Sequence, residues 1–208
     1  NQVQPHSLFT DFDIDLFKAG KHFQLYEKLG AHLIEVDGVK GVYFAVWAPS
    51  ARSVSVVGDF NYWIQGDHQL QVRWDSSGIW EGFIPGIEKG TTYKYKIQSN
   101  NGGIITEKAD PFALFFFLPP KTASVVWDLK HSWNDQSWIK NRQKHNDLDK
   151  PYSVYEVHLG SWKRNAEGKF LTYLELAEEL VNYIKETGFT HVEFMPIMEY
   201  PYDPSWGY

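Results

Sequence analysis

The chain has 208 residues, 43% hydrophobic and 17% aromatic, so it can build a folded core and is too apolar for a disordered protein. Its net charge is −6 without a basic run, which argues against a nucleic-acid partner and an anionic membrane surface. It has no cysteine, which excludes disulfides and thiol chemistry, and no apolar stretch approaches the ~18 residues that a membrane span needs.

The first 30 residues are interpreted as a leader. From Asp13 to Leu29, apolar and polar residues mix in a way that predicts short helical turns capping another domain. The first residues are polar and show no signal peptide, and a chain without cysteine is compatible with a reducing compartment. We therefore expect a cytoplasmic location.

Residues 31–127 have the pattern of an all-β domain. Leu33 to Val36 and Val42 to Trp47 flank an Asp-Gly pair at 37–38, which predicts a hairpin. Further turn signals follow at short intervals. Short strands at this spacing, over roughly 100 residues, predict an immunoglobulin-like β-sandwich.

One predicted strand of this domain alternates clearly between aromatic or apolar residues and lysines. In the alternating segment 92–97, Tyr93, Tyr95 and Ile97 should share one face, and Lys94 and Lys96 the other. The aromatic face is expected to enter the core. The lysine face is expected to point away from it.

Residues 128–150 are charged and polar, and we interpret them as a linker. From Pro151 the pattern becomes strand, helix, strand, with strands expected at 152–157 and 190–194. Such a unit predicts a parallel strand pair and an α/β fold. A complete (β/α)₈ barrel takes about 250 residues, so residues 151–208 would supply only its first two units.

The helix between these strands has clear end signals. Thr172 and Glu175 have the spacing of an N-terminal capping box, and Gly188 is suited to the position after the last turn. A stripe at helical spacing marks the face expected to be buried. Its members are Tyr173, Leu176, Ala177, Leu180, Val181 and Ile184.

Three segments resemble one enzyme family in the same order. YEVHLGSWKR at 155–164, followed by 173–208, resembles the start of the catalytic barrel of 1,4-alpha-glucan (glycogen) branching enzymes in the alpha-amylase superfamily. FAVWAPSARSVSVVGDFNYW at 44–63 resembles their glycogen-binding β-sandwich, and 11–32 resembles their lead-in. The resemblance implies a sandwich followed by the first two βα units of a (β/α)₈ TIM barrel.

The resemblance also implies a reaction. The family cleaves an α-1,4 bond by a retaining double displacement and re-attaches the segment through an α-1,6 bond, in glycogen biosynthesis. Retention needs two carboxyl groups about 5–5.5 Å apart. In the family these lie on later barrel strands, beyond Tyr208, so we expect this chain alone to be inactive. Four carboxylates of this chain could be considered as substitutes, and none is assigned a catalytic role: Glu156, Glu193, Glu199 and Asp203.

The loop that ends in WGY carries the first substrate-binding candidates. By resemblance, Tyr208 matches a tyrosine that stacks on the sugar ring next to the scissile bond, with Trp206 and Asp203 as weaker candidates. The family usually has HPFDGSWGY, and three positions differ: Tyr200, Tyr202 and Pro204. Proline fixes φ near −65°, so the local loop shape is expected to differ.

The sandwich offers a second site by resemblance. In glycogen-binding modules a tryptophan after a G-x-F-N-x-W turn and a lysine from a later strand hold maltooligosaccharide, and Trp63 and Lys94 match them. A second platform tryptophan has no counterpart in 101–111. One stack contributes on the order of 1 kcal/mol, whereas millimolar affinity needs about 4 kcal/mol, so binding would matter through multivalency on a polymer. The alternative is that the sandwich only braces the barrel.

The remaining features limit the options. Trp47, Trp74 and Trp80 are expected to be core or edge packing. The histidines lack metal-ligand spacing and there is no phosphate-binding loop, so we expect neither a metal nor a cofactor. The resemblance implies α-glucans as the partners. Two other functions stay open: a debranching or trehalose-releasing hydrolase of the same superfamily, and a non-catalytic glucan-binding module. The 155–164 segment and the leader favour branching.

Overall fold

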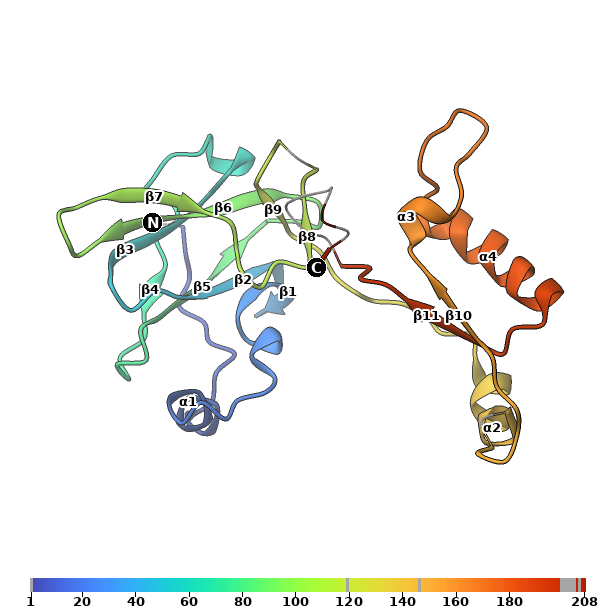
Figure 1. Cartoon of the computed structure of the whole chain (residues 1–208). Coiled ribbons are helices and arrows are strands. Elements are labelled where there is room, and N and C mark those ends of the chain that lie inside the picture. The colour runs from blue at the N-terminus through green and yellow to red at the C-terminus, as the bar shows by residue number, and fades with distance from the viewer. Residues whose placement is uncertain (1, 119, 146, 199–204, 206) are drawn as a thin grey trace. The chain divides into compact units, whose positions relative to one another are not determined.

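This computed structural model describes residues 2–118, 120–145, 147–198, 205 and 207–208. The chain divides into two compact units, Asn1–His131 and Ser132–Tyr208 (Figure 1). Within the part of the chain that is described, no helix has the length and apolar character needed to cross a membrane.

The first unit is a β-sandwich, as predicted. Its helical elements are α1 (Asp11–Lys18), η1 (Leu25–Glu27) and η2 (Asp59–Asn61). Its strands are β1 (Gly30–Val36), β2 (Val39–Trp47), β3 (Ala51–Gly58), β4 (Gln71–Val72), β5 (Ile79–Pro85), β6 (Thr92–Ser99), β7 (Ile105–Lys108), β8 (Phe115–Phe116) and β9 (Ser124–Val125). One sheet has the order β1-β2-β5-β4; the other has the order β3-β6-β9-β8, with β7 paired to β6.

The hairpin predicted between the first two strands is confirmed. Asp37 and Gly38 have φ values of 50° and 80°, both left-handed, and Val36 pairs with Val39 across the turn. A two-residue turn with both φ positive matches the right-handed twist of the strands. This is why an Asp-Gly pair suits the position.

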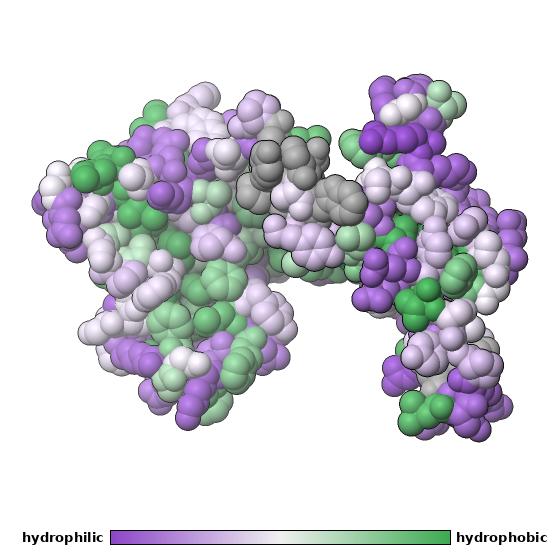
Figure 2. Space-filling model, in the orientation of Figure 1, coloured by the Kyte–Doolittle hydropathy of each residue, from purple (hydrophilic) through white to green (hydrophobic). Residues whose placement is uncertain are grey.

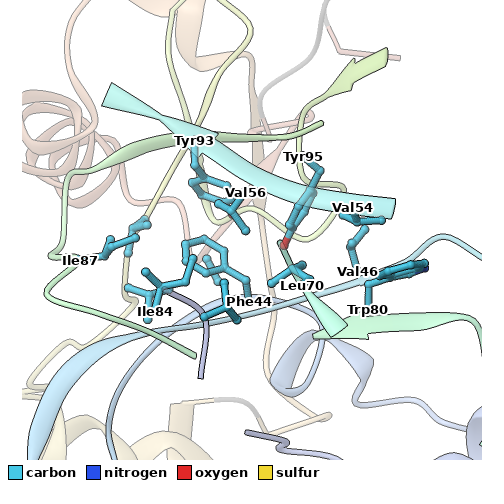
Figure 3. Close-up of a cluster of buried hydrophobic side chains, with 14 of the residues drawn as sticks. Phe44, Val46, Val54, Val56, Leu70, Trp80, Ile84, Ile87, Tyr93 and Tyr95 are labelled. Carbon is cyan, nitrogen blue, oxygen red and sulfur yellow. The ribbon is translucent and has the colours of Figure 1, made fainter. Parts of the chain in front are cut away.

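The main core lies between the two sheets (Figure 3). Phe44 of β2 meets Tyr93 of β6 edge to face, with ring centroids 5.0 Å apart, and neither side chain is exposed. Tyr95 is also fully buried, and Ile97 packs against the same core. The predicted aromatic face of β6 is therefore confirmed, and Lys94 lies on the opposite face, half-buried.

A buried carboxylate fixes β6 from inside. Asp110, 1% exposed, accepts hydrogen bonds from the Tyr93 hydroxyl at 2.6 Å and the Tyr95 hydroxyl at 3.1 Å. Burial raises the pKa of Asp110 above the ordinary value of 3.8, against the effect of these bonds. Because both tyrosines are tied inward, Lys94 between them on β6 must point to the outer face.

The leader covers the outer face of the other sheet. Phe9, Ile14 and Leu29 form a buried cluster with residues of β2 and β5. An ion-pair network supports it: Arg73 donates to Glu81 at 2.6 Å, and Ser7 of the leader donates to the same carboxylate at 2.9 Å. The predicted helical turns thus cover the outer face of this sheet.

The tryptophans divide between core and surface. Trp80 is 7% exposed and donates Nε1–H to the Ala48 carbonyl at 3.0 Å, so its predicted core role is confirmed. Trp47 is 56% exposed, but its Nε1–H bonds the Ser77 carbonyl, which makes it edge packing. The packing prediction is wrong for Trp74, which is 84% exposed, because it lies in the turn between β4 and β5 rather than in a strand.

The second unit contains α2 (Gln136–His145), β10 (Val154–Val157), α3 (Leu159–Trp162), α4 (Tyr173–Thr187) and β11 (His191–Phe194). Strands β10 and β11 are parallel, as predicted, with Val154 opposite His191. Helix α2 lies inside the segment 128–150 that was interpreted as a linker. Its lysine, arginine and glutamine residues favour helix even without an apolar stripe.

Helix α4 has the predicted ends. Thr172 and Glu175 form the reciprocal capping box, and Gly188 follows the last turn with φ 80°. Only one line of the predicted stripe is buried, Leu176, Leu180 and Ile184. Leu180 and Ile184 form a core with Val157. A single pair of strands offers a narrow surface, so the rest of the stripe stays exposed.

Apolar side chains accordingly reach the surface of the second unit, where Figure 2 shows them among polar ones. The exposed members include Val154, Phe170, Leu174, Val181 and Phe194, each at least 42% exposed.

The inter-sheet core predicts a stability difference between two phenylalanines. Phe44→Ala should lower the free energy of unfolding by about 3–5 kcal/mol, because it removes a fully buried ring and leaves a cavity. Phe23→Ala, which truncates a ring that is 88% exposed, should change it by less than about 0.5 kcal/mol. Urea denaturation of both variants measures the difference. Equal losses would contradict the described core.

Candidate functional site

The candidate site begins at the turn that follows β3. Asn61, only 4% exposed, accepts the Gly58 N–H at 2.9 Å and donates to the Val56 carbonyl at 2.9 Å. Its amide also donates to His68 Nδ1 at 3.0 Å. Burial lowers the pKa of His68, which favours the neutral imidazole that can accept this bond. Sequence reasoning missed Asn61, although an asparagine at the start of a turn was a usable signal.

The closed turn holds an unusual backbone. Tyr62 and Trp63 both have left-handed φ values, 54° and 60°, which are uncommon for residues other than glycine. The Trp63 N–H bonds the Gly58 carbonyl at 3.0 Å. Tyr62 is 85% exposed and Trp63 is half-buried. The turn therefore presents two aromatic residues at the end of β3.

Pairing between β3 and β6 brings the predicted lysine to the same region. Val57 is the register partner of Lys94, one position before Gly58, where β3 ends and the turn starts. Lys94 Nζ donates to Thr122 Oγ1 at 2.8 Å. An ammonium has three donors, so this bond leaves donors for a ligand.

A carboxylate connects the turn to β6. Asp59 accepts the Trp63 Nε1–H at 2.9 Å through Oδ1, and the Thr92 hydroxyl at 2.6 Å through Oδ2. Thr92 lies two positions before Lys94, on the same face of β6. We call Asp59, Trp63, Thr92, Lys94 and Thr122 the outer-face cluster.

The electrostatics of this cluster centre on Asp59. The hydrogen bond from Thr92, followed by that from Trp63, lowers the pKa of Asp59 below the ordinary 3.8. The carboxylate is thus ionised and acceptor-only at neutral pH. The positive charge of Lys121 lowers the pKa of Asp59 further. The Lys121 Nζ itself lies 4.8 Å from the centroid of the Phe117 ring.

The neighbouring strand adds no aromatic platform. The segment 101–111, which has no second platform tryptophan, contains β7. In β7, Glu107 lies opposite Lys96, and the two form an ion pair at 3.1 Å. The outer-face cluster therefore has one indole with polar groups around it.

The second unit holds the other predicted residues. Tyr208 is 81% exposed, whereas Asp203 and Trp206 lie outside the described residues. Glu156 and Glu193 are register partners on the parallel strands, and both are exposed. We assign these two no catalytic role.

Among the described residues, no cluster of three or more His, Asp or Glu side chains has the geometry to hold a metal ion. The chemistry of the outer-face cluster is that of a ring face for stacking, flanked by a cation and a carboxylate.

Known proteins with similar sequences carry carbohydrate-related names. The family described as Carbohydrate-binding module 48 (Isoamylase N-terminal domain) matches residues 28–113. The 1,4-alpha-glucan branching enzyme of Gloeobacter violaceus is 54% identical over 205 residues, 97% of this chain. That of Aquifex aeolicus is 52% identical over 208 residues, 99% of this chain.

In sequence, the chain is thus similar to 1,4-alpha-glucan branching enzymes along nearly its whole length. It spans 28% of the Gloeobacter enzyme and 33% of the Aquifex enzyme, so about a third or less of their length. The family resemblance stated from the sequence motifs is thereby confirmed.

Solved structures of alpha-amylase type share the fold. A putative alpha amylase from Salmonella typhimurium matches with a TM-score of 0.62 and 24% identity, over 86% of this chain and 26% of that one. A Klebsiella pneumoniae pullulanase complexed with maltotriose matches with a TM-score of 0.57 and 24% identity, over 83% of this chain and 18% of that one. At this identity the likeness concerns the fold alone.

The lowered pKa of Asp59 predicts how its bond to Trp63 responds to acid. The folded-state pKa lies below the unfolded value, so the bond's contribution is present above 3.8 and is lost as the pH falls through the lower folded value. The Trp63 indole N–H resonance should therefore move with a midpoint below pH 3.8. Thr92→Val should raise the midpoint. An NMR titration measures it, and a wild-type midpoint at or above 3.8 would contradict the geometry.

Proposed function

We propose that the whole protein is a glycogen branching enzyme, which cleaves α-1,4-glucan and re-attaches the cut segment through an α-1,6 bond. The observation that carries the proposal is the identity of 54% and 52% to two branching enzymes over 97% and 99% of this chain. The proposed partners are α-glucans such as glycogen, amylose and maltooligosaccharides. The proposed location is the cytoplasm.

Within this function, we propose that the sandwich binds α-glucan at the outer-face cluster. Trp63 would stack on the apolar face of a glucose unit, and Lys94 would donate a charge-assisted hydrogen bond to its hydroxyls. The support is that a turn and a strand from distant parts of the sequence bring these two residues to the same end of one sheet face. A single indole gives weak binding per site, which suits a polymer with many repeats.

For the second unit, we propose the start of a (β/α)₈ barrel at residues 151–208, preceded by a linker at 128–150, a sandwich at 31–127 and a leader at 1–30. The support is the parallel β10-β11 pair with α4 between them in sequence. The exposed apolar side chains Val154 and Phe194 suit a sheet that further strands and helices would cover. In this proposal Tyr208, Trp206 and Asp203 belong to the loop after β11, where substrate binds.

A hydrolase of the same superfamily is the competing function. Pullulanase and alpha amylase share the fold, but at 24% identity, whereas the Gloeobacter and Aquifex branching enzymes are 54% and 52% identical. The identity therefore favours transfer over hydrolysis.

Transfer and hydrolysis give different products from amylose. The whole protein should reduce the iodine colour of amylose without releasing reducing sugar in the same proportion, because each cut end is re-attached. Parallel iodine and reducing-sugar assays measure this. Reducing sugar that rises in step with the loss of colour would identify a hydrolase instead.

Retardation in glycogen gels tests the outer-face cluster. Trp63→Ala should weaken glycogen binding about fivefold, the equivalent of one lost stack of about 1 kcal/mol. Lys94→Ala should weaken it to a similar degree. Trp74→Ala, which removes an 84% exposed indole elsewhere, is the matched control and should leave mobility unchanged. Unchanged retardation of Trp63→Ala would show that glycogen does not bind at Trp63, and no retardation of the wild type would show that the sandwich only braces.

A further inference from the structure

We propose that Asp59 is the positioning residue of the outer-face cluster: its carboxylate holds the Trp63 indole in the orientation that offers the ring face to an α-glucan. This role rests on the proposed glucan binding at Trp63. Asp59 itself is not required to touch the sugar.

The carboxylate is held on both oxygens. Oδ1 accepts the Trp63 Nε1–H at 2.9 Å, and Oδ2 accepts the Thr92 hydroxyl at 2.6 Å. Thr92 is buried at the start of β6, a strand that is anchored from the inside by Asp110. The bond from Thr92 therefore fixes Asp59 relative to the sheet. The bond from Trp63 to Asp59 in turn fixes the indole.

The tryptophan is then fixed at both ends. Its backbone is set by the left-handed φ of 60° and by the N–H bond to the Gly58 carbonyl. Its far edge is set by the bond from Nε1 to Asp59. A side chain with two rotatable bonds that is held at its backbone and at its outer edge has little rotamer freedom left to lose when a ligand binds.

The bond also decides which part of the indole meets a ligand. An indole has one polar donor, and here that donor is used by the carboxylate. What remains for a ligand is the ring face, which suits the apolar face of a glucose unit. Pre-orientation of this kind strengthens binding by reducing the cost of ordering, without adding a contact.

The test measures glycogen dissociation constants by affinity electrophoresis of residues 1–208, together with hydrogen exchange of the Trp63 indole N–H by NMR. Asp59→Ala should weaken binding roughly two- to tenfold, the equivalent of ordering one freed side chain. It should also speed exchange of the indole N–H. Asp59→Asn keeps an oxygen acceptor for Nε1–H and should bind like the wild type.

Two further variants separate positioning from other roles. Glu107→Ala removes a carboxylate from the same sheet face, where it pairs with Lys96, and should leave binding unchanged. In a Trp63→Phe background, which keeps a ring but has no N–H, Asp59→Ala should have no additional effect.

Several results would overturn the proposal. Asp59→Ala with wild-type affinity would end it, as would an equal loss from Asp59→Ala in the Trp63→Phe background, which would mean direct contact with sugar. Loss of binding by Asp59→Asn as great as by Asp59→Ala would assign the effect to charge. If Trp63→Ala retains full retardation, the glucan site itself falls and this role falls with it, a result distinct from the other three.

Discussion

The buried amide of Asn61 is the contact on which the outer-face cluster depends. It satisfies the Gly58 N–H, the Val56 carbonyl and His68 within one turn, where the β3 ladder stops. Leaving such buried groups without partners costs about 1–3 kcal/mol each. Because these bonds close the turn, the chain can hold Tyr62 and Trp63 in left-handed conformations. The tryptophan of the candidate site is thus placed by an asparagine that no ligand would reach.

A second constraint acts from the core. Tyr93 and Tyr95 are tied to Asp110 between the sheets, and a strand that points these residues inward must point Lys94 outward. The direction of the half-buried Lys94 side chain is therefore fixed by the same alternation that buries the two tyrosines. The two constraints meet where Thr92 of β6 and Trp63 of the turn share the carboxylate of Asp59.

Local patterns were predictable from the sequence because local physics determines them. The alternation of Tyr93 and Tyr95, the Asp37-Gly38 turn and the capping box at Thr172 each depend on residues within a few positions of one another. The prediction that Trp63 and Lys94 bind the same sugar rests on the family resemblance, and a ligand-binding experiment tests it.

What escaped prediction is set by distant parts of the chain. The bond between Asp59 and Thr92 joins residues 33 positions apart, so no sequence window contains it. Trp74 carries the same indole as Trp80, yet one is 84% exposed and the other 7%. Their difference comes from strand boundaries that tertiary pairing decides. Helix α2 was likewise hidden in a segment whose charged composition is equally suited to a linker.

The central claim is that the outer face of the β3-β6 sheet binds α-glucan. An NMR titration of the isotope-labelled chain with maltoheptaose tests it most directly. The account predicts shifts concentrated at Trp63, including its indole N–H, and along β6 around Lys94, with Trp74 unaffected. Shifts centred on Trp74, or none at the outer-face cluster when the sugar is raised well above millimolar concentration, would contradict it.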